Sequence, residues 1–220
     1  MASVTKFTDF SVDQINFSEV HKNKLGGKAI YLTGKNSQKL QLQLPPARAP
    51  FGLSPFEDKA TKKVTYTIPL SLDDEALKQF FIDLDAKILD HVATNSEEIL
   101  GKKMSLEVLT ELYTPLAKYG KDPAYAPQLK LKVQQGRNGD FVPKAYDMKR
   151  NPIPLDEIEK QDTIHTIVDI NQIWVVDKKF GVSVRLEQVM KVPSTKLSEC
   201  AFSVSDAEEE IDVPAFVESE

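Results

Sequence analysis

The segment from Leu112 to Arg150 combines cations and aromatic rings in a way that suits contact with a polyanion. It holds eight lysines and arginines against three carboxylates. Single-strand binders need this pairing, because cations neutralise phosphates and flat rings stack on bases without reading their sequence. A solvated sheet face above core aromatic residues would give the same composition, so both interpretations stand. The cations are Lys118, Lys121, Lys130, Lys132, Arg137, Lys144, Lys149 and Arg150, and the interleaved rings are Tyr113, Tyr119, Tyr125, Phe141 and Tyr146.

The segment from Gln172 to Val192 carries a second group of candidate contacts. Trp174 precedes a turn predicted from Asp177 to Gly181, which contains Lys178, Lys179 and Phe180. After the turn, Val182, Val184 and Leu186 alternate with Ser183, Arg185 and Glu187, which predicts a half-buried strand with Arg185 on its polar face. Trp174 is either a stacking platform for a base or a residue of the core.

The last fifteen residues form an acidic tail. Residues 206–220 carry seven carboxylates and no lysine or arginine, whereas the rest of the chain has 28 basic and 26 acidic residues. A polar, acidic run with little to bury is expected to be disordered. Because it also contains Phe216, this tail can mimic nucleic acid or dock on basic partners. A purely solubilising tail is the other interpretation.

Catalytic and metal-binding motifs are not found. The chain has no phosphate loop, no Gly-x-Gly-x-x-Gly and no Gly-x-Ser-x-Gly element. A dyad of Cys200 and His165 can be drawn, but Cys200 borders the tail and lacks the surroundings of a nucleophile. The other histidines, His21 and His91, show no metal-ligand spacing. We therefore expect a protein that is not an enzyme and that carries no metal and no cofactor.

Composition also indicates the cellular compartment of the protein. No apolar run approaches the roughly 20 residues that span a bilayer, and the N-terminus lacks the apolar stretch of a secretory signal. A single cysteine excludes an intrachain disulfide. We expect an intracellular protein in a reducing compartment, without a membrane partner.

The elements that must position these residues are mostly strands. Alternation of apolar and polar residues predicts strands around residues 40–44, 64–70, 129–133, 164–170 and 181–192. Prolines between residues 45 and 55 mark a loop or an edge strand. A helix capped by Ser71 and two shorter helices, one from Ser96 to Gly101 and one from Ser105 to Pro115, interrupt the strands. This order predicts a mainly β fold with one helical insertion (α+β), either a barrel or a sandwich of Greek-key type. We expect one domain over residues 1–204, with the insertion around 71–117, followed by the tail over 205–220.

The C-terminal third resembles a known group of proteins. The spacing of Trp174, Phe180, Gly181, Val182 and Gln188 resembles that in proteins encoded by large nucleocytoplasmic DNA viruses. That group is similar to phage replication single-stranded-DNA-binding proteins with an OB-fold and an acidic tail that ends in an aromatic residue. The resemblance covers roughly residues 128–192 and the tail, whereas the first 125 residues match in element order alone.

The resemblance implies an OB-fold-like Greek-key β-barrel with extra strands and helices, which binds single-stranded DNA in replication, recombination or repair. It implies that the tail covers the basic site in the free protein and recruits a polymerase, helicase or primase when DNA displaces it. A homodimer through tail exchange is compatible with this sequence, and a viral protein would act in the host nucleus or at a cytoplasmic replication site. The predicted nucleic-acid contacts are Lys130, Lys132, Arg137, Lys144, Tyr146, Lys149, Arg150, Trp174, Lys178, Lys179, Phe180 and Arg185, and the predicted tail contacts are Glu208, Glu209, Glu210, Asp212 and Phe216.

One alternative belongs to a different class. A structural or virion-associated β-sandwich interaction protein would not bind nucleic acid at all. It would instead show a large apolar surface patch and an obligate oligomeric state.

Overall fold

The computed structural model describes residues 4–22, 26–59 and 61–193. The predicted tail over 205–220, with its candidate contacts Glu208, Glu209, Glu210, Asp212 and Phe216, lies outside the described residues, as does Cys200.

Within the described residues, five strands make a small barrel. Strand β13 pairs antiparallel with β6 on one side and with β14 on the other, β14 pairs in parallel with β10, and β10 pairs antiparallel with β8. Strand β8 packs back against β6. This closed order is the strand order of an OB-fold, so the prediction of a mainly β, OB-fold-like barrel is confirmed. The strands are β6 (Ala47–Ala49), β8 (Val64–Ser71), β10 (Gln128–Val133), β13 (Asp162–Val176) and β14 (Lys179–Lys191).

Short strands and turns extend the barrel. Strands β4 and β5 widen the sheet on β13, and the proline-containing β7 forms an edge on β8, as predicted for that segment. The added strands are β1 (Thr5–Lys6), β2 (Asn16–Phe17), β3 (His21–Lys22), β4 (Lys28–Thr33), β5 (Gln41–Gln43), β7 (Ser54–Glu57), β9 (Tyr113–Thr114), β11 (Lys144–Tyr146) and β12 (Pro152–Ile153). The 3-10 turns are η1 (Phe7–Asp9), η2 (Val12–Gln14), η3 (Lys35–Ser37) and η4 (Leu155–Glu157).

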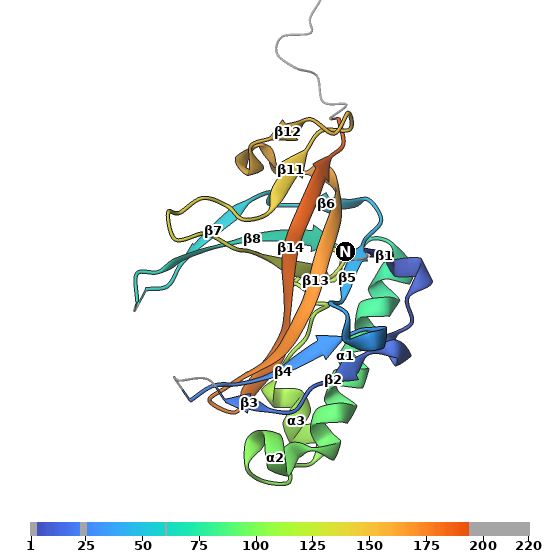
Figure 1. Ribbon diagram of the computed structural model, residues 1–220, viewed down its shortest axis with the longest axis vertical. Helices are drawn as coiled ribbons and strands as arrows, with labels where there is room; N and C mark the ends of the chain where they lie inside the picture. Colours follow the sequence, from blue (N-terminus) through green and yellow to red (C-terminus); the bar gives the residue numbers. More distant parts are fainter. Residues whose placement is uncertain (1–3, 23–25, 60, 194–220) are drawn as a thin grey trace, which may run out of the picture.

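Strands β13 and β14 form the long curved hairpin at the centre of the molecule (Figure 1). Asp177 and Lys178 connect them, and both have positive φ, at 49° and 69°. This is the geometry of a two-residue type I′ turn, whose twist matches that of the paired strands. The turn is therefore shorter than predicted, because Lys179, Phe180 and Gly181 belong to β14.

The helical insertion lies between β8 and β10 and is gathered on one side of the curved hairpin (Figure 1). Asp74 caps the first helix, because its carboxylate accepts a hydrogen bond of 2.7 Å from the Leu77 amide. The predicted cap, Ser71, is instead the last residue of β8. The helices are α1 (Glu75–Thr94), α2 (Ser96–Leu100) and α3 (Leu106–Leu112). Within the described part of the chain, none of the helices combines the length and apolar character needed to cross a membrane.

A buried network ties the insertion to the barrel. Phe180 on β14 lies with its ring 5.1 Å from that of Tyr113. The Tyr113 hydroxyl donates to the carboxylate of Asp85 on α1 at 2.5 Å. The apolar stripe of α1 and the inward side chains of β13 and β14 share the same hydrophobic core. Helix α1 therefore covers the inner side of the sheet and leaves its other side to solvent.

Candidate nucleic-acid interface

The solvent side of the barrel strands brings cations and rings together. We call it the outer face; its side chains alternate with those of the hydrophobic core along each strand, and two of them, Asp169 and Ser183, are themselves buried. Pairing of β13 with β14, β4 and β5, and of β10 with β8 and β14, aligns these side chains in adjacent rows. The outer face comprises Tyr31, Gln41, Gln43, Thr65, Thr67, Lys130, Lys132, Lys144, Tyr146, His165, Ile167, Asp169, Gln172, Trp174, Lys179, Ser183, Arg185, Gln188 and Met190.

Lys132 and Arg185 lie at the centre of this face. They are register partners in the parallel pairing of β10 with β14. The Lys132 ammonium donates to the Ser183 hydroxyl at 2.9 Å. Burial of the ammonium, and then the nearby Arg185 charge, lower the pKa of Lys132 from its ordinary value. A phosphate placed here would oppose both effects, since its negative charge favours the protonated form of Lys132.

Carboxylates beside this pair have a reduced tendency to ionise. Asp169 faces Arg185 across the β13–β14 ladder. Burial raises the pKa of Asp169, against the opposing charges of Lys39 and Arg185. Burial and then the neighbouring Asp169 also raise the pKa of Glu187. When ionised, the two carboxylates would repel a phosphate chain that lies along Arg185.

Rings lie at the hairpin end of the outer face. Trp174 is half-buried, is absent from the hydrophobic core, and pairs with Gly181 across the hairpin. A Cβ atom at position 181 would lie 2.8 Å from Cζ2 of Trp174, so the indole rests directly on the glycine. On the neighbouring strand β4, Tyr31 is 43% exposed and pairs with Gln172. The geometry therefore favours Trp174 as a surface platform over a core residue.

The structure brings seven predicted contacts onto this face. They come from β10, β11, β13 and β14, which pair side by side. Lys144 and Tyr146 are aligned by register with Gln188 and Met190. The seven are Lys130, Lys132, Lys144, Tyr146, Trp174, Lys179 and Arg185.

One predicted contact is wrong. Phe180 has a relative exposure of 0% and belongs to the core, where it packs on Tyr113. Its ring cannot stack on a base without unfolding the strand. The alternation of Phe180 with Val182 and Val184 already carried this signal in the sequence.

Four predicted cations lie on turns beside the sheet. Arg137 belongs to the turn closed by the hydrogen bond from the Gly136 amide to the Asp140 carbonyl. Lys149 and Arg150 lie in the turn between β11 and β12, and Lys178 lies at the tip of the β13–β14 hairpin. The structure does not place these four within the rows of the outer face.

Sequence reasoning missed several exposed groups near this face. Phe56 on β7 is opposite Thr65, an outer-face residue of β8. Arg48 on β6 projects outward between the buried Ala47 and Ala49. Tyr31 could have been identified, because it alternates with Ile30 and Leu32 in a strand-like segment.

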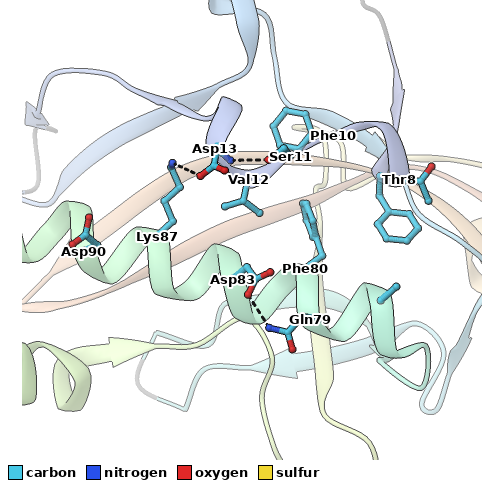
Figure 2. A pocket seen from close by; sticks show the side chains of 12 residues that line it. Thr8, Phe10, Ser11, Val12, Asp13, Gln79, Phe80, Asp83, Lys87 and Asp90 are labelled. Carbon is cyan, nitrogen blue, oxygen red and sulfur yellow. Dashed lines mark hydrogen bonds and ion pairs between the residues drawn. The ribbon is translucent and has the colours of Figure 1, made fainter.

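A hollow along α1 has the opposite electrostatic character. Figure 2 shows Phe10 and Phe80 near one another, with Asp13, Asp83 and Lys87 along the hollow. It has a volume of about 900 Å³, and its carboxylates outnumber its cation. Lys87 is also engaged by Asp13 at 3.4 Å. This hollow would repel phosphates, so we leave it out of the interface. The described residues contain no group of His, Cys, Asp and Glu side chains suited to a metal ion.

Solved structures with partial similarity include two phage proteins. The single-stranded DNA-binding protein gp2.5 encoded by bacteriophage T7 is similar with a TM-score of 0.42 and 14% identity, over 82% of this chain and 100% of that chain. The single-stranded DNA-binding protein from bacteriophage Enc34, in complex with single-stranded DNA, is similar with a TM-score of 0.42 and 12% identity, over 82% and 97%.

Sequence comparisons place the chain among relatives without an assigned activity. The uncharacterized protein L291 of Acanthamoeba polyphaga mimivirus is 25% identical over 166 residues, which are 71% of this chain. The chain spans 27% of the length of that relative. Residues 59–202 match the model of a family of unknown function, DUF5871. Since this match covers more than half of the chain, the protein belongs to the DUF5871 family.

Proposed function

We propose that this protein binds single-stranded DNA on its outer face, without catalysing a reaction, in replication, recombination or repair. The observation that carries the proposal is the alignment of Lys130, Lys132 and Arg185 with Trp174 on one solvent-facing surface of an OB-like barrel. The face of OB strands 2 and 3, which correspond to β8 and β10, is where such barrels bind oligonucleotides.

The arrangement suits a single strand better than a duplex. The basic side chains lie at intervals along β10 and β14, where they can contact successive phosphates. Trp174 and Tyr31 present their rings at one end of the same surface. Ring stacking requires unpaired bases, because duplex bases are already stacked on each other. A duplex would be left with phosphate contacts alone.

The test is fluorescence anisotropy of a labelled oligothymidine of about 30 nucleotides and of a duplex of the same length, at several salt concentrations. We expect tighter, salt-sensitive binding to the single strand. Replacing both Lys130 and Lys132 with Gln should flatten the dependence of log K on log salt by about 0.7 per lost phosphate contact. Lys87→Gln is the matched control, because it removes a cation of α1 that lines the separate hollow along that helix. Absence of binding to both nucleic acids would reject the function.

The acidic tail supplies the second part of the proposal. Its carboxylates Glu208, Glu209, Glu210 and Asp212 compete with phosphates for the outer face, and Phe216 competes with a base. Once DNA displaces the tail, it becomes available to a polymerase, helicase or primase, or to a second copy of this chain. In a virus-infected cell such a protein would act in the nucleus or at a cytoplasmic replication site.

A further inference from the structure

A hollow of about 480 Å³ lies where the β8–β10 ladder ends. Gln128 and Ser71 are register partners in that ladder and both line the hollow. The two preceding rungs on the same side hold Lys130 with Pro69 and Lys132 with Thr67. The distance along β10 from Lys132 to Gln128 is about 13 Å, given roughly 3.3 Å per residue. A single DNA strand that follows Lys132 and Lys130 therefore reaches the hollow.

Two exposed rings stand at this hollow. Phe51 is 51% exposed and Tyr125 is 66% exposed, and both line it. They come from segments far apart in the sequence, so local chain geometry does not explain why they share one hollow. Exposed aromatic rings around one concavity are typical of a ligand site.

Both rings are carried by fixed turns. Gly52 follows Phe51 with a φ of 59°, and a Cβ there would lie 2.5 Å from the Ile158 carbonyl oxygen. The turn is thus pressed against residues 158 and 159 and holds Phe51 outward. Tyr125 lies in a turn in which the Asp122 carboxylate accepts from the Ala124 amide at 2.9 Å. Rings held in place before binding lose little conformational entropy when they stack.

The charges around the hollow nearly cancel. Arg48 and Lys121 line it together with Asp122. The Arg48 guanidinium donates to Gln161 at 3.1 Å and to Ser71 at 3.5 Å, and it lies 3.5 Å from the Asp73 carboxylate. Binding here would therefore depend on ring stacking more than on phosphate neutralisation.

We propose that Phe51 and Tyr125 form a clamp that stacks an unpaired nucleobase of a strand leaving the β8–β10 ladder. This inference rests on the proposed function and extends it to a subsite made of residues outside the predicted contacts. Under this proposal, Lys130 and Lys132 contribute electrostatic attraction to phosphates along the β8–β10 ladder, and Phe51 and Tyr125 contribute base stacking at the end of the ladder.

The test is oligothymidine anisotropy with Phe51→Leu, Tyr125→Leu and the double variant, at several salt concentrations. We expect about tenfold weaker binding for each single variant, with an unchanged salt slope, because stacking releases no counterions. Phe51→Tyr should keep wild-type affinity. Tyr119→Leu is the matched control, since Tyr119 is a 62% exposed tyrosine that does not line the hollow.

The outcomes separate the two proposals. Wild-type affinity in Phe51→Leu and Tyr125→Leu, in a protein that binds oligothymidine, would overturn the clamp and leave the function intact. Equal losses in Tyr119→Leu would also overturn it. If the wild-type protein does not bind oligothymidine at all, the proposed function fails and the clamp with it.

Discussion

The ammonium of Lys132 donates a 2.9 Å hydrogen bond to the Ser183 hydroxyl, across the seam where β10 meets β14. Lys132 and Arg185 are the register partners of this parallel pairing. The seam thus carries two cations side by side, with Asp169 opposite Arg185 on β13, and the proposed ligand would add negative charge beside Lys132.

The first prediction concerns alkaline pH. Because burial and Arg185 lower the pKa of Lys132, it should lose its proton below the pH at which an ordinary lysine does. Affinity for oligothymidine should therefore fall by about threefold as pH rises toward 10, the value of one weak ion pair. Lys132→Arg should remove this fall, because an arginine stays charged.

The same shift affects stability with a known sign. Between the lowered pKa of Lys132 in the folded protein and its ordinary value of 10.5, the unfolded chain binds more protons than the folded one. The contribution of Lys132 to the free energy of unfolding therefore rises with pH in this interval. Lys130→Arg serves as the control for a generic change from lysine to arginine. If the affinity of Lys132→Arg for oligothymidine fell with rising pH as it does in the wild type, the prediction would be contradicted.

The second prediction uses the one tryptophan in the chain. Intrinsic tryptophan fluorescence reports on Trp174 alone, and oligothymidine should quench it. Trp174→Ala should weaken binding about tenfold, within the range of one stacked base, and Trp174→Phe should retain most of the affinity. Unchanged affinity together with a lower Tm in Trp174→Ala would assign the indole a packing role instead.

The third prediction concerns the glycine beneath that ring. A Cβ at position 181 would lie 2.8 Å from the Trp174 indole and 3.0 Å from the Thr114 carbonyl oxygen. Gly181→Ala should displace the indole, lower the free energy of unfolding by about 1–3 kcal/mol and weaken oligothymidine binding. Denaturant titration and anisotropy on the same sample would measure both. Wild-type values for both would show that the indole is not held against the glycine.

The fourth prediction concerns Asp85, which accepts hydrogen bonds from the Tyr113 hydroxyl and from the amides of Leu116 and Ala117. Asp85→Ala leaves these buried donors unpaired and should cost about 2–4 kcal/mol in denaturant titration. Asp83→Ala is the matched control on the same helix, with an expected change below about 0.5 kcal/mol. Similar losses in both variants would rule out this role.

The pH dependence of Asp85 also has a definite sign. Burial raises the pKa of Asp85 above its ordinary 3.8, against the hydrogen bonds it accepts. The folded state then holds its proton more strongly than the unfolded chain, so this contribution to stability is present at low pH and is lost as pH rises through the interval above 3.8. Asp85→Asn should remove that component of the pH profile.

The fifth prediction concerns the tail. Deleting residues 206–220 should tighten oligothymidine binding, and the gain should shrink as salt rises, because an intramolecular competitor is removed. A variant with Phe216→Ala and intact carboxylates tests whether the ring contributes. Equal affinity of full-length and truncated protein at every salt concentration would show that the tail does not compete.

Much of the fold could be predicted from local patterns, because each of these patterns depends on neighbours in the chain. The alternation around Leu131 gave β10, and Ser96 with Gly101 marked the ends of α2. The helix cap was displaced from Ser71 to Asp74, because pairing with Gln128 extends β8 to Ser71. The boundary between β8 and α1 therefore depends on the pairing of Ser71 with Gln128, which are far apart in the sequence.

The candidate site could be predicted in part. Lys130 and Lys132 follow from simple alternation, but β13 does not keep one alternation along its length. The register shift between Ile170 and Gln172 leaves Asn171 as an extra residue in β13 and changes its phase, so that Ile164 and Ile173 are both buried although their positions differ in parity. The side that Trp174 faces therefore could not be read from the sequence alone. The hollow at Phe51 and Tyr125 depends on two distant turns meeting, which no local pattern encodes.

The long β13–β14 hairpin also determines the order in which the strands of the barrel can pair while the chain is being synthesised. Its strands are close in sequence and can pair as soon as both have been made, whereas Ala49 must wait for Asp162, far along the chain. Until then the first strands have exposed edges, a state that favours association between nascent chains. The barrel should therefore close only after the β13–β14 hairpin has been made, and chaperone demand should be highest just before that hairpin leaves the ribosome.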